Sequence, residues 1–418
     1  MSTMAAAVQT LKGFRDILPE EFYARAYVKE KLIAVFERYG FSPIETPTLE
    51  YASLLLGKYG AEADKLIYRF IDAGGREVGL RYDQTVPTAR FIAEHREQLP
   101  GFFRRYQLQN VFRAEKPQKG RFREFTQCDL DIYGTISPIA DAEILSCTYD
   151  AYKAVGFATV VLRCNDRETL TTTLSPFASD TVSIHSIIQS IDKLDKIAAE
   201  GVIDELEKKG MDRERATEVL RAVTSSKPSS ALRQIIDRAI ALGVDKEALS
   251  FDPSLARGLD YYTGMIFEVS VPEYTVGSLG GGGRYDKLLL SLAGVDMPAV
   301  GVGLGFDRIV EAARELNLIP QHTGSSVLVT LFDDESIDEA LSLAHMIRKS
   351  GRAALVYPEA APLSKQFKYA NACKLQYVVV SGPDERAKNV VTVKNMRSGM
   401  QKTIPRSELI TNITSPQS

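Results

Sequence analysis

The segment at residues 111–125 constrains the fold most, because β-prone runs flank an abrupt break in regular structure. Apolar and aromatic residues stand on both sides of the break: Val111, Phe112, Phe122 and Phe125. Between them, Pro117 and Gly120 in the sequence KPQKG disfavour a continuous helix or strand. Residues 105–134 are therefore predicted to form two antiparallel strands joined by a loop.

The same segment is basic, although the chain as a whole is not. Lys and Arg total 51 against 54 Asp and Glu, a formal net charge of −3, so any anion-binding surface must be local. The basic residues in and just before the segment are Arg105, Arg113, Lys116, Lys119, Arg121 and Arg123. Arginines fixed on strands bind phosphate oxygens in pairs of hydrogen bonds, and Phe125 offers a flat face to a nucleobase. On this segment alone, an ordinary exposed charged hairpin is an equal alternative.

Length and composition indicate a globular protein of two or three domains. The chain has 418 residues, of which 44% are hydrophobic and 25% charged. Its cysteines are spaced unlike a zinc site or a disulfide framework, which favours a reducing compartment. The sequence MSTMAAAVQT lacks the features of a signal peptide, and no run approaches the ~18 apolar residues of a membrane span. We expect a cytoplasmic protein with no membrane partner.

Hydrophobic periodicity divides the chain into an N-terminal part and a smaller C-terminal one. Residues 19–39 are predicted to form a helix ended by Gly40, and residues 184–248 a charged helical subdomain. MIFEVSVP is expected to be a strand, GSLGGGGRYDKLLLSL to turn into a helix, and PAVGVGLGFDRIVEAARELN to run from strand to helix. After a polar linker at residues 319–326, strands alternate with helices, which indicates a separate α/β domain.

Two polar clusters contain candidate ligand-binding residues, namely Asp83, Gln84, Thr85, Arg257, Asp260, Tyr261 and Tyr262. The cluster in LRYDQTVPTARF suits an ammonium group, although an ordinary loop is the simpler interpretation of that sequence alone. The cluster in LARGLDYYTGMIFEV crowds polar atoms before an apolar strand. A tight turn with packed tyrosines explains this second pattern poorly.

Two glycine patterns predict that backbone lies close to a ligand. The run from Gly280 to Gly283 carries a large conformational entropy cost, which makes sense where the chain approaches a ligand closely. It matches neither a Walker loop nor GxGxxG, so its signal is weak. Gly301, Gly303 and Gly305 leave one strand face bare before Arg308. This arrangement fits a planar ring of adenine size, with close helix–strand packing as the alternative.

Together and in this order, these segments resemble the class II aminoacyl-tRNA synthetases, and specifically the histidyl-tRNA synthetase family. KGFRDILPEE resembles the family's N-terminal segment, and the helix at residues 20–39 with Pro47 is similar to motif 1, which builds the dimer interface. FRAEKPQKGRFREF resembles motif 2, and GVGLGFDRI resembles motif 3. RGLDYYTG and GGGRYDKL resemble the two peptides peculiar to the histidine enzymes. LSKQFKYAN and QYVVVSG resemble the family's anticodon-binding domain.

The resemblance covers nearly the whole chain and implies an α/β protein of two domains. Residues 1–322 would form the class II catalytic domain, an α+β unit whose antiparallel sheet is flanked by helices. It would include a helical insertion at about residues 174–250, expected to clamp the tRNA acceptor stem. Residues 323–418 would form a mixed α/β anticodon-binding domain. The implied assembly is a homodimer, and the implied ligands are L-histidine, ATP with Mg²⁺, and tRNA(His).

The resemblance also implies a two-step ligation and a role for each matching residue. The carboxylate of histidine attacks the α-phosphate of ATP and releases pyrophosphate, and the terminal ribose hydroxyl of tRNA(His) then takes the histidyl group. Because negative charge builds at phosphorus, positioning and charge stabilisation do the catalytic work. The implied catalytic residues are Arg113 and Arg257. The implied ATP-binding residues are Arg113, Glu115, Arg121, Phe125 and Arg308.

Histidine and tRNA recognition are implied in the same way. Asp131 and Tyr262 would face the imidazole ring, with Tyr261 beside them, because a carboxylate and a hydroxyl together select a ring with two polar nitrogens. The residues matching those that hold the α-ammonium group are Asp83, Thr85 and Gln127. The loop residues expected to meet the tRNA acceptor end are Lys116, Gln118 and Lys119. The sequence does not identify magnesium ligands.

The main alternative is a non-catalytic paralogue, the regulatory subunit of ATP phosphoribosyltransferase, which binds histidine without charging tRNA. That paralogue typically lacks the anticodon domain and has eroded motifs. Here the C-terminal α/β domain is present, and so are Arg113, Arg257 and Arg308. A module that only senses uncharged tRNA is disfavoured by the same residues.

We predict that Arg257→Ala slows histidyl-adenylate formation by at least ~10²-fold, the effect of removing one preorganised charge donor. The measurement is histidine-dependent exchange of pyrophosphate into ATP. Exchange at nearly the wild-type rate would contradict the prediction.

Overall fold

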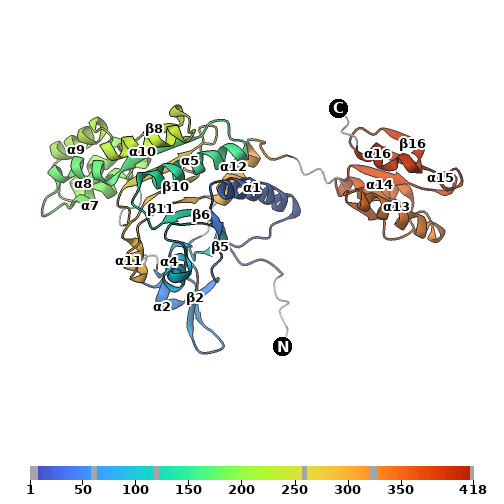
Figure 1. Cartoon of the computed structure of the whole chain (residues 1–418), viewed down its shortest axis with the longest axis horizontal. Coiled ribbons are helices and arrows are strands. Elements are labelled where there is room, and N and C mark those ends of the chain that lie inside the picture. Colours follow the sequence, from blue (N-terminus) through green and yellow to red (C-terminus); the bar gives the residue numbers. More distant parts are fainter. Residues whose placement is uncertain (1–7, 58–63, 117–121, 257–260, 321–326, 415–418) are drawn as a thin grey trace. The chain divides into compact units, whose positions relative to one another are not determined.

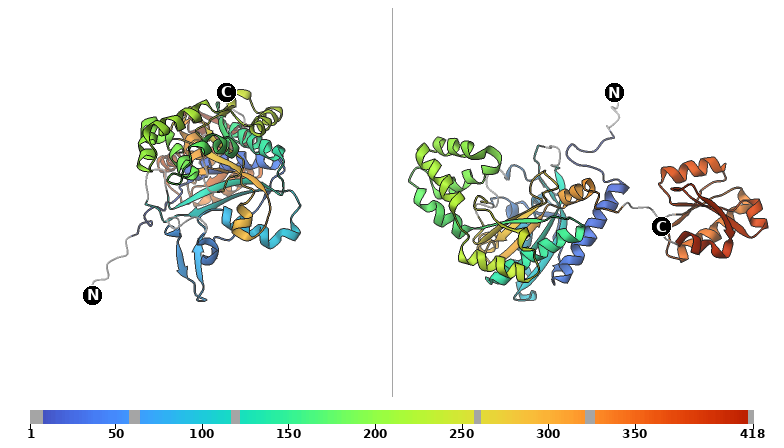
Figure 2. Two further views of the ribbon diagram at one scale, coloured as in Figure 1. Left: turned by 90° about the vertical axis from the view of Figure 1, so that its left-hand side faces the viewer. Right: turned by 90° about the horizontal axis from the view of Figure 1, so that it is seen from above.

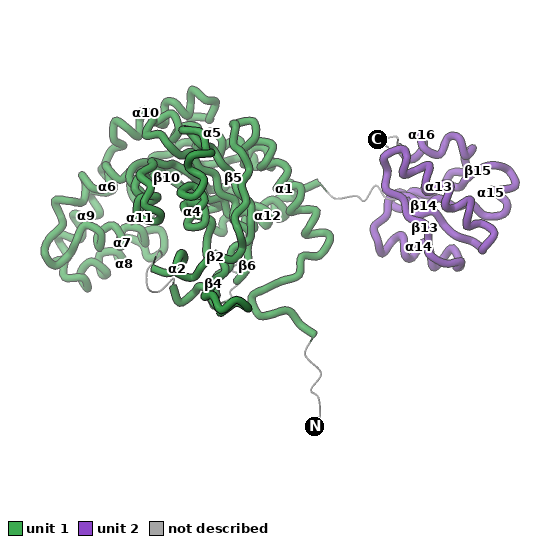
Figure 3. Tube along the Cα trace, turned by 60° about the horizontal axis from the view of Figure 1, so that its bottom comes forward, with its two compact units in different colours: residues 1–320 green, residues 321–418 purple. Residues whose placement is uncertain are grey.

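The computed structural model describes residues 8–57, 64–116, 122–256, 261–320 and 327–414. The chain divides into two compact units, which are coloured separately in Figure 3 and span residues 1–320 and 321–418. Each unit has its own sheet and its own apolar core. Among the described residues, no helix is both long and apolar enough to cross a bilayer.

An eight-stranded sheet forms the centre of the first unit (Figure 1). Its strands follow the order β1 (Ser42–Pro43), β5 (Phe103–Phe112), β6 (Glu124–Tyr133), β11 (Ala299–Leu304), β10 (Gly280–Arg284), β9 (Met265–Ser270), β7 (Val161–Asp166) and β8 (Leu249–Phe251). Neighbours from β5 to β7 pair antiparallel, whereas β1 and β8 add parallel edges. The predicted antiparallel sheet and its strand pair at residues 105–134 are confirmed.

Four helices share one apolar core with this sheet: α1 (Pro19–Arg38), α5 (Pro138–Val155), α10 (Ser230–Ala241) and α12 (Phe306–Glu315). Alternate residues of β6, namely Cys128, Leu130 and Ile132, belong to that core, so the intervening residues face the other side of the sheet. Helix α1 contributes residues at helical spacing: Ala24, Val28, Leu32, Val35 and Phe36. It ends before Gly40, whose φ of +75° favours glycine, and the predicted helix is confirmed.

The glycine run is a strand, which was not predicted from the sequence, and the expected helix begins only after it. Gly280–Arg284 forms β10, which pairs with β9 on one side and β11 on the other. A Cβ at Gly282 would lie 2.0 Å from the carbonyl oxygen of Gly301. Glycine is thus needed because another backbone lies against it, and the helix α11 (Leu288–Ala293) follows only afterwards.

The remaining elements of the first unit lie beside the large sheet. A small sheet has the order β2 (Leu49–Tyr51), β4 (Glu77–Leu80) and β3 (Arg69–Ile71), with helices α2 (Ala52–Leu55) and α4 (Thr85–His95). A group of helices comprises α6 (Arg167–Leu174), α7 (Ile184–Ile191), α8 (Leu194–Lys208), α9 (Arg213–Ser225) and α10 (Ser230–Ala241). Helices α6 to α9 have their own apolar core, and Figure 2 shows this group at one end of the first unit.

The second unit is a five-stranded mixed sheet with helices. The strand order is β13 (Ala354–Val356), β12 (Val327–Val329), β14 (Tyr377–Val380), β15 (Val390–Asn395) and β16 (Gln401–Pro405). The first three strands are parallel and the last two antiparallel. The separate α/β unit expected from the alternation of strands and helices is present. Its helices are α13 (Ile337–Lys349), α14 (Leu363–Ala372), α15 (Pro383–Ala387) and α16 (Leu409–Thr414).

We predict that Gly282→Ala destabilises the first unit by about 1–3 kcal/mol or more, because the added methyl group must displace the backbone of β11. The measurement is thermal unfolding of the full chain. The control is Gly101→Ala, where an added Cβ meets nothing within 4 Å. Equal melting temperatures for the two variants would contradict the prediction.

Candidate active site

A cavity of about 600 Å³ lies on the side of the sheet away from helices α1 and α5. Its walls include glycines of β10 and β11 and the side chains that alternate along β6, namely Phe125, Gln127, Asp129 and Asp131. Most of the predicted site residues line it: Asp83, Thr85, Arg113, Glu115, Phe125, Gln127, Asp131, Tyr261, Tyr262 and Arg308. Segments more than 200 residues apart in the sequence thus converge on one cavity, while the role of each residue stays a prediction.

The other predicted residues are not among the described residues that line this cavity. Lys116 is exposed and lies at the end of the described part of the motif 2 segment. Five more lie outside the described residues: Gln118, Lys119, Arg121, Arg257 and Asp260. Their predicted roles are therefore neither supported nor contradicted by the structure.

One end of the cavity presents a guanidinium group between aromatic rings. The guanidinium carbon of Arg113 lies 4.5 Å from the ring centre of Tyr82 and 5.1 Å from that of Phe125. Its Nε donates a hydrogen bond of 3.2 Å to the carbonyl oxygen of Tyr82. These contacts fix the arginine in orientation without neutralising it, which suits an anionic ligand that also carries a flat ring.

A carboxylate at the same end anchors helix α12. Both oxygens of Asp307 are engaged: Arg15 Nη2 lies 3.0 Å from Oδ1, and the backbone N–H of Thr126 donates to Oδ2 at 3.0 Å. Arg25 of α1 forms a further ion pair with Oδ1. Asp307 thereby ties the N-terminal segment, α1 and β6 to the first turn of α12. The next residue of that helix, Arg308, donates a 2.9 Å hydrogen bond to the carbonyl of Ser278.

The other end of the cavity is acidic. Asp131 on β6 is buried and forms an ion pair with Arg105, its partner in the strand pairing, with Nη2 and Oδ2 2.5 Å apart. The hydroxyl of Tyr285 donates to Oδ1 of the same carboxylate. Burial raises the pKa of Asp131, and the charge of Arg105 and the Tyr285 hydrogen bond oppose that rise.

A second carboxylate, Asp129, stands two residues earlier on the same face of β6. Its Oδ1 is buried and has no hydrogen-bond partner among the described residues. Burial raises the pKa of Asp129 to about 7; the charge of Arg105 opposes this rise, and the nearby charge of Asp131 adds to it. A carboxyl group of this kind changes protonation near neutral pH, so it makes the charge at this end of the cavity adjustable.

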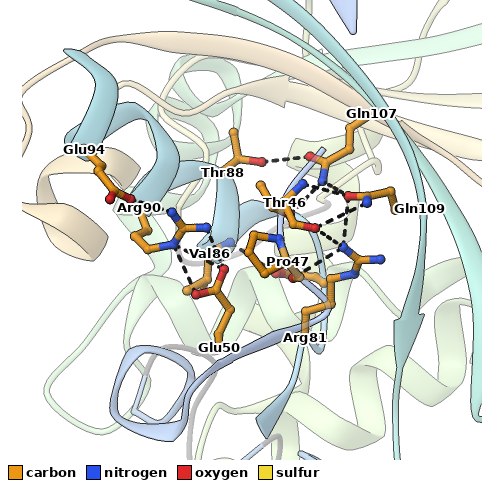
Figure 4. A network of polar contacts seen from close by, with 11 residues as sticks. Thr46, Pro47, Glu50, Arg81, Val86, Thr88, Arg90, Glu94, Gln107 and Gln109 are labelled. Carbon is orange, nitrogen blue, oxygen red and sulfur yellow. Dashed lines mark hydrogen bonds and ion pairs between the residues drawn. The ribbon is translucent and has the colours of Figure 1, made fainter. Parts of the chain in front are cut away.

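A buried polar network lies behind the acidic end (Figure 4). Gln107 accepts from the Thr88 hydroxyl at 3.1 Å and donates to the Thr46 hydroxyl at 2.9 Å. Next to it, Arg81 donates to the side chain of Gln109 at 2.9 Å. The network joins β5 to α4 and to the segment between β1 and β2, so the strand that forms the wall of the cavity is held by polar contacts as well as by packing.

Comparisons with known proteins agree with this arrangement. The family profile described as "Histidyl-tRNA synthetase" matches residues 13–309, and the profile "Anticodon binding domain" matches residues 318–415. A protein named histidine–tRNA ligase from Wolinella succinogenes is 39% identical over 421 residues, covering 94% of this chain and 95% of that protein. The chain belongs to the histidyl-tRNA synthetase family.

Solved structures of the family share the fold over nearly the whole chain. The histidyl-tRNA synthetase of a Nostoc species is 30% identical, with a TM-score of 0.84, and covers 97% of this chain and 98% of its own. A Bacillus halodurans structure, described as an ATP phosphoribosyltransferase regulatory subunit/histidyl-tRNA synthetase, has a TM-score of 0.75 at 23% identity and covers 91% of this chain and 99% of its own. At that identity the second likeness shows the fold alone.

Several residues of the cavity in this family member were missed by sequence reasoning: Arg105, Asp129, Tyr285 and Asp307. Asp129 could have been predicted from the sequence. It lies between Gln127 and Asp131 at the two-residue spacing that places side chains on the same face of a strand. Arg105 was noted only as a basic residue, and its pairing with Asp131 depends on the strand register. Asp307 belongs to the segment that resembles motif 3. Its partners Arg15 and Arg25 lie far away in the sequence, so no local pattern indicates its role.

We predict that Asp129→Asn removes a pH dependence from the stability of the ligand-free chain. The folded-state pKa of Asp129 lies above its unfolded value of about 3.9, so wild-type stability falls as pH rises through this interval, by at most about 1.4 kcal/mol per pH unit. The measurement compares melting temperatures between pH 5.5 and 7.5. The melting temperature of Asp129→Asn should increase relative to that of the wild type as pH rises. The melting temperature of the exposed control Asp296→Asn should not. A constant difference across this range would contradict the prediction.

Proposed function

We propose that the chain ligates L-histidine to tRNA(His) in two steps, through a histidyl-adenylate. The observation that supports this best is the order of groups along β6 and its neighbours. A guanidinium between aromatic rings stands at one end of a continuous cavity, and two buried carboxylates stand at the other. The first end suits a nucleotide and the second suits a cationic amino group and an imidazole. This arrangement supports a model in which the two substrates of the first step bind side by side.

In the first step a carboxylate oxygen of histidine bonds to the α-phosphorus of ATP, and the bond from that phosphorus to pyrophosphate breaks. Arg113, and Arg257 by resemblance, neutralise the charge that develops between two anions. Because no bond to the protein forms, the protein contributes by holding the reactants together and by preorganised charge. The contacts of Arg113 with Tyr82 and Phe125 keep its guanidinium in place before the substrates bind.

ATP is bound by groups at the aromatic end. Phe125 stacks against one face of the adenine and Arg308 covers the other, while Glu115 accepts from the adenine amino group. Arg121 binds the terminal phosphates. Mg²⁺ enters with ATP, because this ion keeps several waters and takes phosphate oxygens with few carboxylates. The described residues bring together no group of three or more His, Cys, Asp or Glu side chains that could hold a metal ion.

Histidine is bound at the acidic end. Asp83, Thr85 and Gln127 hold the α-ammonium group, and Asp131 with Tyr262 reads the imidazole, with Tyr261 beside them. Gln127 is well placed for this role because its side-chain oxygen accepts from the backbone N–H of Gln84 at 3.2 Å, which fixes the amide. A site built from such polar groups rejects side chains that leave them unpaired.

The second step transfers the histidyl group to the terminal ribose of tRNA(His), releasing AMP. Lys116, Gln118 and Lys119 meet the acceptor end, and the helical insertion at about residues 174–250 clamps the acceptor stem. We assign catalysis to residues 1–322 and anticodon recognition to residues 323–418. The working form is a cytoplasmic homodimer.

Aminoacylation with histidine, ATP and tRNA(His) tests this function. We predict histidine-dependent pyrophosphate exchange and histidine attachment to tRNA by the wild type, and exchange at least ~10²-fold slower for Arg113→Ala. Arg113→Ala should still bind histidine in calorimetry, because its guanidinium serves the phosphate end. The control is Arg76→Ala, which removes an exposed arginine paired with Asp72.

A chain that binds histidine but supports neither exchange nor attachment would instead be the regulatory paralogue. The motif residues that line the cavity, and the match to the anticodon-binding profile, favour the ligase.

A further inference from the structure

Arg105 is a buried cation at the wall of the cavity, and its charge must be compensated there. The residue is 2% exposed, and a guanidinium keeps its proton at all ordinary pH values. Burying such a charge is strongly unfavourable unless an opposite charge and hydrogen bonds accompany it. Its ion pair with Asp131, across the pairing of β5 with β6, supplies the opposite charge.

The guanidinium is also held from behind, which fixes its orientation. Arg105 Nη1 donates to the side-chain oxygen of Gln107 at 3.2 Å. Gln107 is itself fully buried and is held by the hydroxyls of Thr46 and Thr88. The guanidinium of Arg105 is therefore held in one position. The ion pair forms when the Asp131 carboxylate adopts the orientation that matches it.

Asp131 is confined from its other sides as well. Tyr285 donates to Oδ1, and Gly301 of β11 pairs directly with Asp131. A Cβ at Gly301 would lie 1.8 Å from Oδ1, so the carboxylate fills the space that a side chain there would occupy. Contacts with β5, β11 and Tyr285 thus confine the Asp131 carboxylate of β6 to one position.

We propose that Arg105 is a positioning residue for histidine selection, acting through Asp131 by holding that carboxylate ionised and in one orientation towards the substrate's ring. The inference rests on the proposed function, since it concerns the same pocket. An ionised carboxylate only accepts hydrogen bonds, so it favours a ring that presents an N–H to it. A protonated carboxyl group would donate instead and would lose that selection.

Removing Arg105 changes the charge balance of the pocket in a defined direction. Burial raises the pKa of Asp131, and Arg105 is the strongest influence opposing that rise. The other charged or titratable groups facing this pair are Asp83, Arg113, Asp129, Tyr133, Tyr261, Tyr262 and Tyr285. Arg113 stands beside Tyr82 and Phe125 at the other end of the cavity, so Asp131 and Asp129 would lose the buried cation beside them. Without Arg105 the pKa of Asp131 would rise further, which favours the protonated carboxyl group.

The test replaces Arg105 in the full chain and measures histidine binding by calorimetry and histidine-dependent pyrophosphate exchange. Arg105→Met should raise both the Kd and the KM for histidine at least about 30-fold, the effect of stranding one partner of a buried charge pair. The kcat at saturating histidine and the KM for ATP should stay within about 3-fold, because the phosphate groups are bound elsewhere. The acid limb of kcat/KM for histidine should move to higher pH, since Asp131 must now lose a proton to function. Arg105→Lys keeps the positive charge, so the acid limb of its kcat/KM profile should lie close to that of the wild type.

A double-mutant cycle separates positioning from folding. On an Asp131→Asn background, Arg105→Met should add no further loss of histidine affinity, because its target carboxylate is gone. The double variant removes both charges of the Arg105–Asp131 ion pair, so it provides a folded comparison even if Arg105→Met alone unfolds. The matched control is Arg104→Met on the same strand, whose arginine pairs with Glu143 instead and should leave the KM for histidine unchanged.

The outcomes distinguish this inference from the proposed function. An unchanged Kd for histidine in Arg105→Met would overturn the inference, and so would a loss of affinity that persists in full on the Asp131→Asn background. A wild type that binds histidine in an Arg105-dependent way but never exchanges pyrophosphate would support the inference and overturn the ligase function.

Discussion

The cavity exists because two adjacent central strands carry glycine where it lies. Gly281 of β10 and Gly301 and Gly303 of β11 line it, and Gly301 lies directly opposite Asp131. With no side chain at 301, the Asp131 carboxylate can lie across the face of β11. Glycine is unfavourable in a strand taken alone, but hydrogen bonding to neighbours on both sides of β10 and β11 compensates for the lost packing. A Cβ at Gly301 would lie 1.8 Å from Oδ1 of Asp131 and one at Gly303 3.3 Å from Oδ1 of Asp129, so both carboxylates use the space that these glycines leave.

Within that space, a single strand sets the order of the ligand-binding groups. Residues two apart on β6 present an aromatic ring, an amide and two carboxylates in sequence along the cavity. Arg113 supplies positive charge at the aromatic end, and Arg105 partly neutralises the acidic end. A substrate pair with anionic phosphates at one end and a cationic ammonium at the other matches this gradient. The strand's period therefore sets the spacing between the aromatic and the acidic groups of the cavity.

The parts of this structure that sequence reasoning predicted are those that depend on local pattern. The strands flanking Pro117 and Gly120, the helix after Pro19 and the alternation after residue 326 follow from periodicity and turn residues. The glycine strand β10 was misread because glycine has no strand preference, and only its two neighbours make it a strand. The pairing of Arg105 with Asp131 needed the register of β5 with β6, which no local window contains. Family resemblance supplied most ligand-facing residues but none of the side chains that hold them.

Asp307 shows why such supporting side chains matter to the nucleotide end. It stands in the first turn of α12, where the helix dipole favours a carboxylate, and it accepts from β6 while pairing with Arg15 and Arg25. Those arginines lie 292 and 282 residues away in the sequence. Because Arg308 follows Asp307 on the same helical turn, any displacement of α1 is transmitted to Arg308 through one carboxylate. The helix that resembles motif 1 is therefore joined to the predicted adenine site by charge as well as by packing. A neutral residue at 307 would remove the ion pairs that Arg15 and Arg25 form with α12, and with them the hydrogen bond from the backbone of β6.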